Sequence, residues 1–288
     1  MRKLFLAVLL LFNLTLSSQK DFLKPNTVPY KVLTRIHDFD YNTAYELIEK
    51  SSRTLKKEER YFLKVNYFWW IYVTSNDKKQ YRDSLLAYID STKQYVKAKR
   101  MQNSYIALIN NGFEYRLAFK EDRFIDGIQS AHRMAEQIQT ALDSAEYSPY
   151  YKLTASIYLF STGYGKEKYW ILYPYFLMIP EGDVKKGIKY LKELSDHSNK
   201  ILATESAYTL MRIYMDIYRD YEKAYPLAEK IVKLHPENLF YRALQLKIKE
   251  KLNKLTRFDL QQYRIIYSQT DFINPESEVF FKDWHNIK

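Results

Sequence analysis

Apolar residues along most of the chain recur at intervals of three and four, which is the spacing of one face of an α-helix. The clearest stretches are residues 58–74, 99–119, 149–160, 200–218 and 239–254. Glycine contributes only 6 of the 288 residues, so few positions favour breaks or tight turns. The pattern predicts an all-α protein of long helices joined by short connections.

A second pattern occurs five times between these stretches. An acidic or aromatic lead-in precedes a small residue, and apolar residues follow about four and seven positions later. The small residues are Ala44, Ser84, Gly127, Gly187 and Ala224. Offsets of four and seven share one helical stripe, where a small side chain lets a neighbouring helix approach closely. With one longer helix per copy, the sequence predicts an α-solenoid of about five helix-pair repeats over residues 30–255.

Residues 220–238 read DYEKAYPLAEKIVKLHPEN. This run resembles the second helix and closing turn of a tetratricopeptide repeat, with Ala224 and Pro236 in the family's order and spacing. The block from Pro180 to Leu191 is similar to one found between repeats of bacterial tetratricopeptide proteins. The earlier copies lack the closing proline, and Arg212 stands where the family has a small residue. The resemblance implies a tetratricopeptide-like fold and supplies no activity.

The N-terminus has the layout of a signal peptide. Arg2 and Lys3 precede the apolar residues 4–16, and polar residues follow. Thirteen helical residues span about 20 Å, short of the ~30 Å hydrocarbon core of a bilayer. We therefore expect residues 1–18 to be a cleaved signal peptide and 19–29 a linker. The protein is then exported, either to the periplasm or to the outside of the cell, where it is secreted or lies at the cell surface. Because the chain has no cysteine, we expect it to be neither lipidated nor disulfide-bonded.

The formal net charge is +11. Lysine and arginine are mostly interspersed with glutamate and aspartate, as on solvated helix faces. We expect no nucleic-acid partner, whereas the charge permits peripheral contact with a membrane.

The 60-residue interval between Gly127 and Gly187 contains an aromatic insertion at about residues 163–182. Two interpretations stay open. The insertion either packs across the helices and fills the core, or forms a surface for a ligand or partner, because aromatic rings with polar tips suit partly hydrated recognition. The candidate surface residues are Tyr164, Trp170, Tyr173 and Tyr175.

The other candidate sites are weaker. Oxygen ligands from Asp38 to Glu49 follow EF-hand spacing, but Thr43 stands where that calcium loop requires glycine. The five histidines are scattered singly, and no nucleotide-binding or nucleophile motif occurs. Trp69 and Trp70 lie in a segment that is apolar all round, which predicts core. We expect no catalytic residue, metal or cofactor, and a capping helix with a tail over residues 256–288.

These observations favour a non-enzymatic, exported protein-binding or scaffold protein with a protein or peptide partner. A small-solute or glycan-binding module closed by the aromatic insertion is the alternative. An enzyme that uses a pair of carboxylates, such as a glycosidase, is a third hypothesis.

Overall fold

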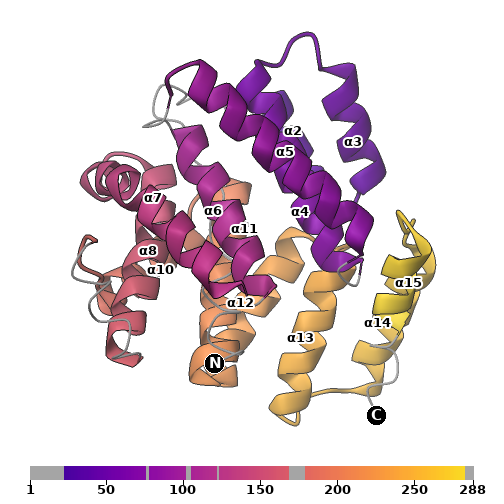
Figure 1. Ribbon diagram of the computed structural model, residues 1–288. Coiled ribbons are helices and arrows are strands. Elements are labelled where there is room, and N and C mark those ends of the chain that lie inside the picture. Colours follow the sequence, from indigo (N-terminus) through magenta and orange to yellow (C-terminus); the bar gives the residue numbers. More distant parts are fainter. Residues whose placement is uncertain (1–22, 76–77, 102–104, 122, 169–178, 283–288) are drawn as a thin grey trace.

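The computed structural model describes residues 23–75, 78–101, 105–121, 123–168 and 179–282. Within these ranges the regular structure is entirely helical (Figure 1). The predicted all-α class is therefore confirmed. The predicted signal peptide, residues 1–18, lies outside the described residues.

From α2 to α14, helices that follow one another among the described residues pack side by side, and α15 packs against α13. In chain order they are α2 (Val28–His37), α3 (Tyr41–Lys50), α4 (Lys57–Thr74), α5 (Lys79–Ala98), α6 (Tyr105–Lys120), α7 (Phe124–Ser144), α8 (Pro149–Lys168), α10 (Val184–Ser195), α11 (Lys200–Arg212) with a π-helical end (Ile213–Tyr218), α12 (Tyr221–Leu234), α13 (Leu239–Lys251), α14 (Arg257–Gln269) and α15 (Pro275–Lys282). All five stretches with helical periodicity are helices, and the stretch at residues 99–119 begins later than predicted, at Tyr105.

The acidic lead-in of the repeated pattern has a local role. The side chains of Asp40, Asp183 and Asp220 each accept a hydrogen bond from a backbone N–H in the first turn of the helix that follows. Each satisfies a donor that would otherwise lack a helical partner. The small residue four positions later then lies on the buried face of the helix: Ala44 and Ala224 are fully buried.

Gly187 shows why that position must be small. A Cβ atom placed there would lie 2.6 Å from the carbonyl oxygen of Ser156 and 2.7 Å from the backbone nitrogen of Phe160. The backbone of α10 therefore rests directly on α8, as the sequence pattern predicts. The connection before α10 is fixed to the same helix, because the Tyr158 hydroxyl donates to the carbonyl of Pro180 over 2.5 Å.

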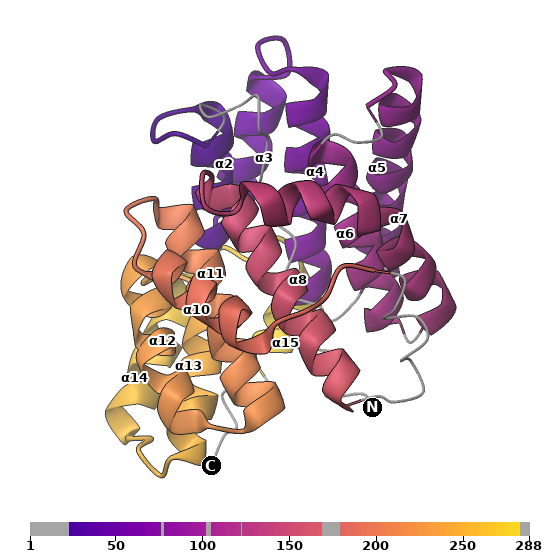
Figure 2. The ribbon, with the colours of Figure 1, turned by 90° about the vertical axis from the view of Figure 1, so that its left-hand side faces the viewer.

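The first helices of the chain pack against the last ones (Figures 1 and 2). Trp70 of α4 is only 5% exposed. Its ring lies 5.7 Å from that of Tyr208 in α11, and 6.1 and 6.3 Å from those of Phe240 and Tyr241 in α13. The predicted burial of Trp69 and Trp70 is confirmed. Side chains of the chain itself thus fill the space between its two halves.

The C-terminal segment also returns to the N-terminal half. The Ser75 and Ser277 hydroxyls are 2.9 Å apart, and Asn274 donates to the Ser75 hydroxyl over 3.1 Å. Phe281 is fully buried, with its ring 5.3 Å from that of Phe39. The tail as far as residue 282 is therefore part of the folded body.

The contact at Gly187 predicts that Gly187→Ala destabilises the protein. On an exposed helix face this exchange would stabilise by about 0.5–1 kcal/mol, but the added methyl group overlaps the α8 backbone and should cost about 1–3 kcal/mol. Urea unfolding followed by circular dichroism measures the difference. Lys189→Ala, on the exposed face of the same helix, is the matched control; an unchanged or higher stability for Gly187→Ala would contradict the close approach.

Candidate functional site

The turn between α2 and α3 carries two carboxylates. Phe39 occupies the left-handed region with φ of 69°, a conformation that is costly for a bulky residue. Contacts of its ring with Tyr41 and Phe281 hold it there. Asp38 ends α2 and Asp40 caps α3 on either side of this turn, so the strained residue positions both acids.

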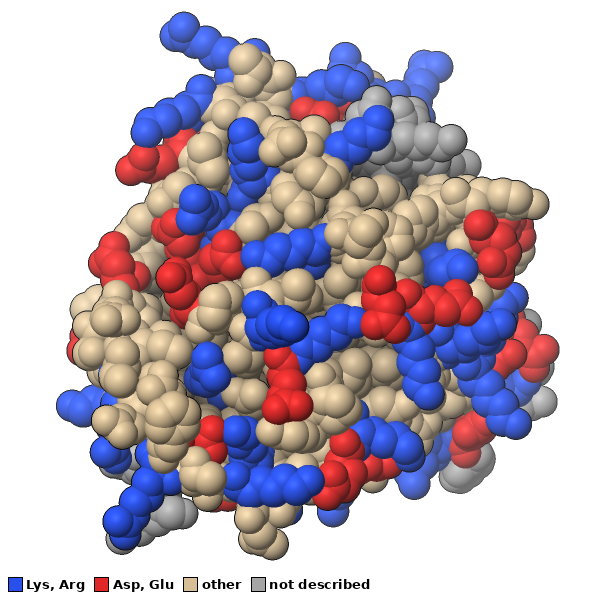
Figure 3. Space-filling model, turned by 180° about the vertical axis from the view of Figure 1, so that it is seen from behind, with Lys and Arg blue, Asp and Glu red and all other residues tan. Residues whose placement is uncertain are grey.

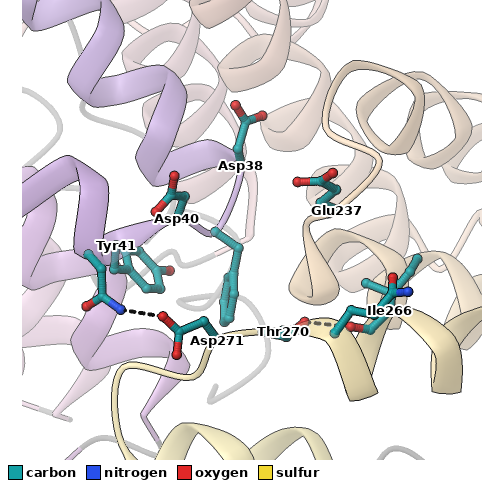
Figure 4. A pocket seen from close by; sticks show the side chains of 10 residues that line it. Asp38, Asp40, Tyr41, Glu237, Ile266, Thr270 and Asp271 are labelled. Carbon is teal, nitrogen blue, oxygen red and sulfur yellow. Dashed lines mark hydrogen bonds between the residues drawn. The ribbon is translucent and has the colours of Figure 1, made fainter.

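The two acids line a pocket of about 240 Å³ at the junction of three chain segments. The second wall is Glu237, in the turn between α12 and α13, and the third comprises the end of α14 and Asp271. In Figure 4 the Glu237 carboxylate faces the side that carries Asp38 and Asp40. Phe39 and Tyr41 supply apolar surface. The acidic pocket, as we call it, therefore combines four carboxylates with aromatic walls.

Two cations offset part of this negative charge. Lys200 Nζ lies 3.3 Å from Asp38 Oδ1, and Arg35 lies 3.4 Å from Asp40 Oδ2. Asp271 accepts a hydrogen bond from the neutral amide of Asn42 over 2.8 Å, whereas Glu237 makes no hydrogen bond or ion pair with the described residues. The pocket thus retains an excess of carboxylates and attracts a cation.

Behind the pocket, Asp38 leads into a buried polar cluster. His235 is fully buried, and its Nδ1 lies 2.6 Å from Asp38 Oδ1. Its Nε2 lies 2.8 Å from the hydroxyl of Thr204 in α11. Asp38 therefore faces the pocket and anchors an imidazole at the same time.

Burial fixes the protonation state of this pair. Burial of His235 is the largest effect and lowers its pKa to about 4, although the hydrogen bond to Asp38 acts in the opposite direction. Burial alone would raise the pKa of Asp38, but the hydrogen bond from His235 and the charges around it outweigh burial and lower it. At neutral pH a neutral His235 therefore donates from Nδ1 to an ionised Asp38.

His37 lies beside His235, with the ring centroids 5.5 Å apart. Its Nε2 is 3.1 Å from Glu205 Oε1, and its Nδ1 is 2.7 Å from the hydroxyl of Tyr241. The backbone carbonyl of His37 accepts from Asn238 over 2.6 Å. The buried histidine cluster, comprising His37, His235 and these partners, joins α2 to α11 and α13.

The order Thr204, His235, Asp38 is that of a hydroxyl–imidazole–carboxylate triad. The Thr204 side chain, however, is fully buried and its hydroxyl also lies 2.8 Å from the carbonyl of Lys200. A nucleophile must reach its substrate, which a buried hydroxyl cannot do. The hydrogen bonds of Thr204 therefore stabilise the packing of α11. Among the described residues no three histidine, aspartate or glutamate side chains are placed to hold a metal ion.

The predicted aromatic surface is described only at Tyr164. Its ring stacks on Phe160 at 5.8 Å and meets Tyr218 edge-on at 6.2 Å. Gly163 and Gly165 belong to α8, which continues to Lys168, so the insertion begins with a helix end. Trp170, Tyr173 and Tyr175 lie outside the described residues, so the surface expected at these three residues stays a prediction.

The side chains with EF-hand spacing point to different partners. Asp38 binds His235, Asp40 caps α3 and Asn42 donates to Asp271. Glu46 and Glu49 pair with Lys50 and Lys64. The segment instead forms one wall of the acidic pocket.

No local signal in the sequence marks the histidine cluster. His37 and His235 are 198 residues apart and lack the short spacing that marks paired ligands or acid–base residues. The resemblance places His235 beside the closing proline of a repeat, but nothing in that position predicts a second histidine next to it.

The sequence matches no protein-family model, and no curated protein and no solved structure matches it significantly. None of the described helices is both long enough and apolar enough to cross a membrane.

The lowered pKa of His235 predicts loss of stability in mild acid. The unfolded chain takes up a proton near pH 6.5, whereas folded His235 stays neutral down to about pH 4. Stability is therefore full above pH 6.5 and declines between these values, by about 3 kcal/mol at the lower end. Urea unfolding at a series of pH values measures the decline.

His235→Gln should lower stability at every pH and flatten this dependence, because glutamine does not titrate. The control is His197→Gln, which removes a half-buried imidazole between α10 and α11. This variant should keep most of the pH dependence of stability. An equally steep dependence in His235→Gln and the unmodified protein would contradict the assignment.

Proposed function

We propose that the chain is an exported, non-enzymatic protein-binding or scaffold protein built on a tetratricopeptide-like helical array. We further propose that its acidic pocket holds a lysine or arginine side chain of a partner protein. The capped helices, the small residues at their contacts and the resemblance of residues 220–238 support the repeat architecture.

The acidic pocket carries the proposal. Its volume of about 240 Å³ is below the roughly 300–1,000 Å³ typical of small-molecule sites, and suits an inserted side chain. Lysine and arginine combine an aliphatic stem with a charged end. The stem fits against Phe39 and Tyr41, and the charged end meets the carboxylates.

The net charge of +11 does not prevent binding of a cation at this place. Fields from exposed charges are screened beyond about 8 Å at physiological ionic strength. The four carboxylates therefore dominate the potential inside the pocket.

The burial of Thr204 and Tyr241 supports a non-enzymatic role, because both hydroxyls lie beside an imidazole and neither has access to a substrate.

A comparison of bait proteins tests the proposal. The double variant Glu237→Gln/Asp271→Asn removes two exposed pocket charges with little change of shape. Immobilised unmodified chain and variant are exposed to the same cell-envelope extract, and retained proteins are quantified by mass spectrometry. We expect at least one protein whose recovery falls about 10-fold or more, since a hydrogen bond to a charged group contributes about 1.5–3 kcal/mol.

The control variant is Glu46→Gln/Glu222→Gln, which removes two exposed carboxylates elsewhere. It should retain the same protein as the unmodified chain, and replacement of one basic residue of that protein by glutamine should abolish retention. Equal recoveries with all three baits would overturn the proposed role of the pocket.

A further inference from the structure

Exposed positive charge gathers where α3 leads into α4 and where α5 ends. We call this surface the basic end. Its cations are Arg53, Lys56, Lys57, Arg60, Lys97, Lys99 and Arg100, of which Arg60 is half-buried and the others are exposed. Figures 1 and 2 place both segments at the same, upper end of the molecule, and Figure 3 shows lysine and arginine side chains projecting there.

Direct contacts join the two segments. The Tyr95 hydroxyl near the end of α5 donates to Glu58 at the start of α4 over 2.9 Å. Lys57 lies over the rings of both Tyr61 and Tyr95, 5.6 Å from each centroid. The antiparallel packing of α4 and α5 thus makes one surface from residues some forty positions apart.

The cations of the basic end form no ion pair with the described residues. Elsewhere lysines are commonly paired: Lys223 with Asp220, Lys249 with Asp259 and Lys254 with Glu222. The two carboxylates of the basic end have other roles, since Glu58 accepts from Tyr95 and Glu59 accepts from the backbone of Lys56. The basic end thus has seven cations and only two carboxylates, both already hydrogen-bonded to other groups. Its net charge is therefore strongly positive.

The composition of this surface indicates the kind of partner. A specific protein interface centres on buried apolar or aromatic anchors, and the exposed large apolar side chains of the described residues all lie outside the basic end. Four of the seven cations are lysines, which act as mobile point charges rather than as bidentate forks. Tyr61 and Tyr95 are partly exposed, as suits rings at a membrane–water boundary.

We propose that the basic end docks the protein peripherally onto a membrane surface rich in anionic lipid headgroups. The attraction is electrostatic and inserts no helix into the bilayer. It requires cations whose charge is not neutralised by a nearby carboxylate, and the basic end supplies cations that form no ion pair with the described residues. Long lysine and arginine side chains reach headgroups without a fixed geometry.

Cosedimentation of the full chain with vesicles tests this. One vesicle preparation is phosphatidylcholine alone, and the other contains phosphatidylglycerol in addition. We expect binding to the second only, with strong weakening at high salt. The triple variant Lys56→Gln/Lys57→Gln/Lys99→Gln should lower the partition coefficient on the order of 100-fold. All variants share residues 1–22, so that segment cannot produce a difference between them.

The matched control is Lys233→Gln/Lys247→Gln/Lys251→Gln, which removes three exposed and unpaired charges on α12 and α13. It should bind within a few-fold of the unmodified chain. Equal losses in the two triple variants, or equal binding to both vesicle types, would overturn the proposal. A fluorescent duplex DNA serves as a competing ligand. If the unmodified chain binds this DNA more tightly than the anionic vesicles, and the first triple variant loses that binding, the partner of the basic end is nucleic acid and not a membrane.

Discussion

The buried histidine cluster is the constraint on which the arrangement of the two chain halves depends. His37, His235 and Glu205 have lost nearly all contact with water, and each buried polar group left without a partner costs about 1–3 kcal/mol or more. A shift of α2 along α11 and α13 would break several of these hydrogen bonds together. The cluster therefore favours one register between elements about 200 residues apart in the sequence. Apolar contacts such as those of Trp70 would specify that register less strictly.

This closure determines where a ligand can bind. In an array of helix pairs the concave face is the usual recognition surface, but here rings of α4, α11 and α13 occupy the space between the first and last helices. The proposed recognition site lies at the rim, where the same closure brings the turn at Asp38 beside Glu237 and Asp271. Asp38 belongs to both the cluster and the pocket, so the interaction that closes the fold also orients one carboxylate of the site.

The sequence predicted what depends on neighbouring residues. Helical periodicity located the long helices, and the stripe of small residues predicted the close contact at Gly187. The structure adds that the acidic residues of the same pattern, Asp40, Asp183 and Asp220, cap the helices that follow them. It did not predict the pocket or the histidine cluster, because their parts meet only after the halves close. Gly163, where the expected insertion begins, lies inside α8, and the start of α10 packs closely against it.

The acidic pocket and the basic end carry opposite charges, and α3 runs from the N-terminal wall of the pocket toward the basic end. Asp40 caps the N-terminal end of α3, and Arg53 lies three residues beyond its last residue. A helix of 10 residues separates them by about 15 Å, nearly twice the ~8 Å screening length at physiological ionic strength. Neither site neutralises the other, so the proposed docking to an anionic surface is compatible with the proposed binding of a cation in the pocket.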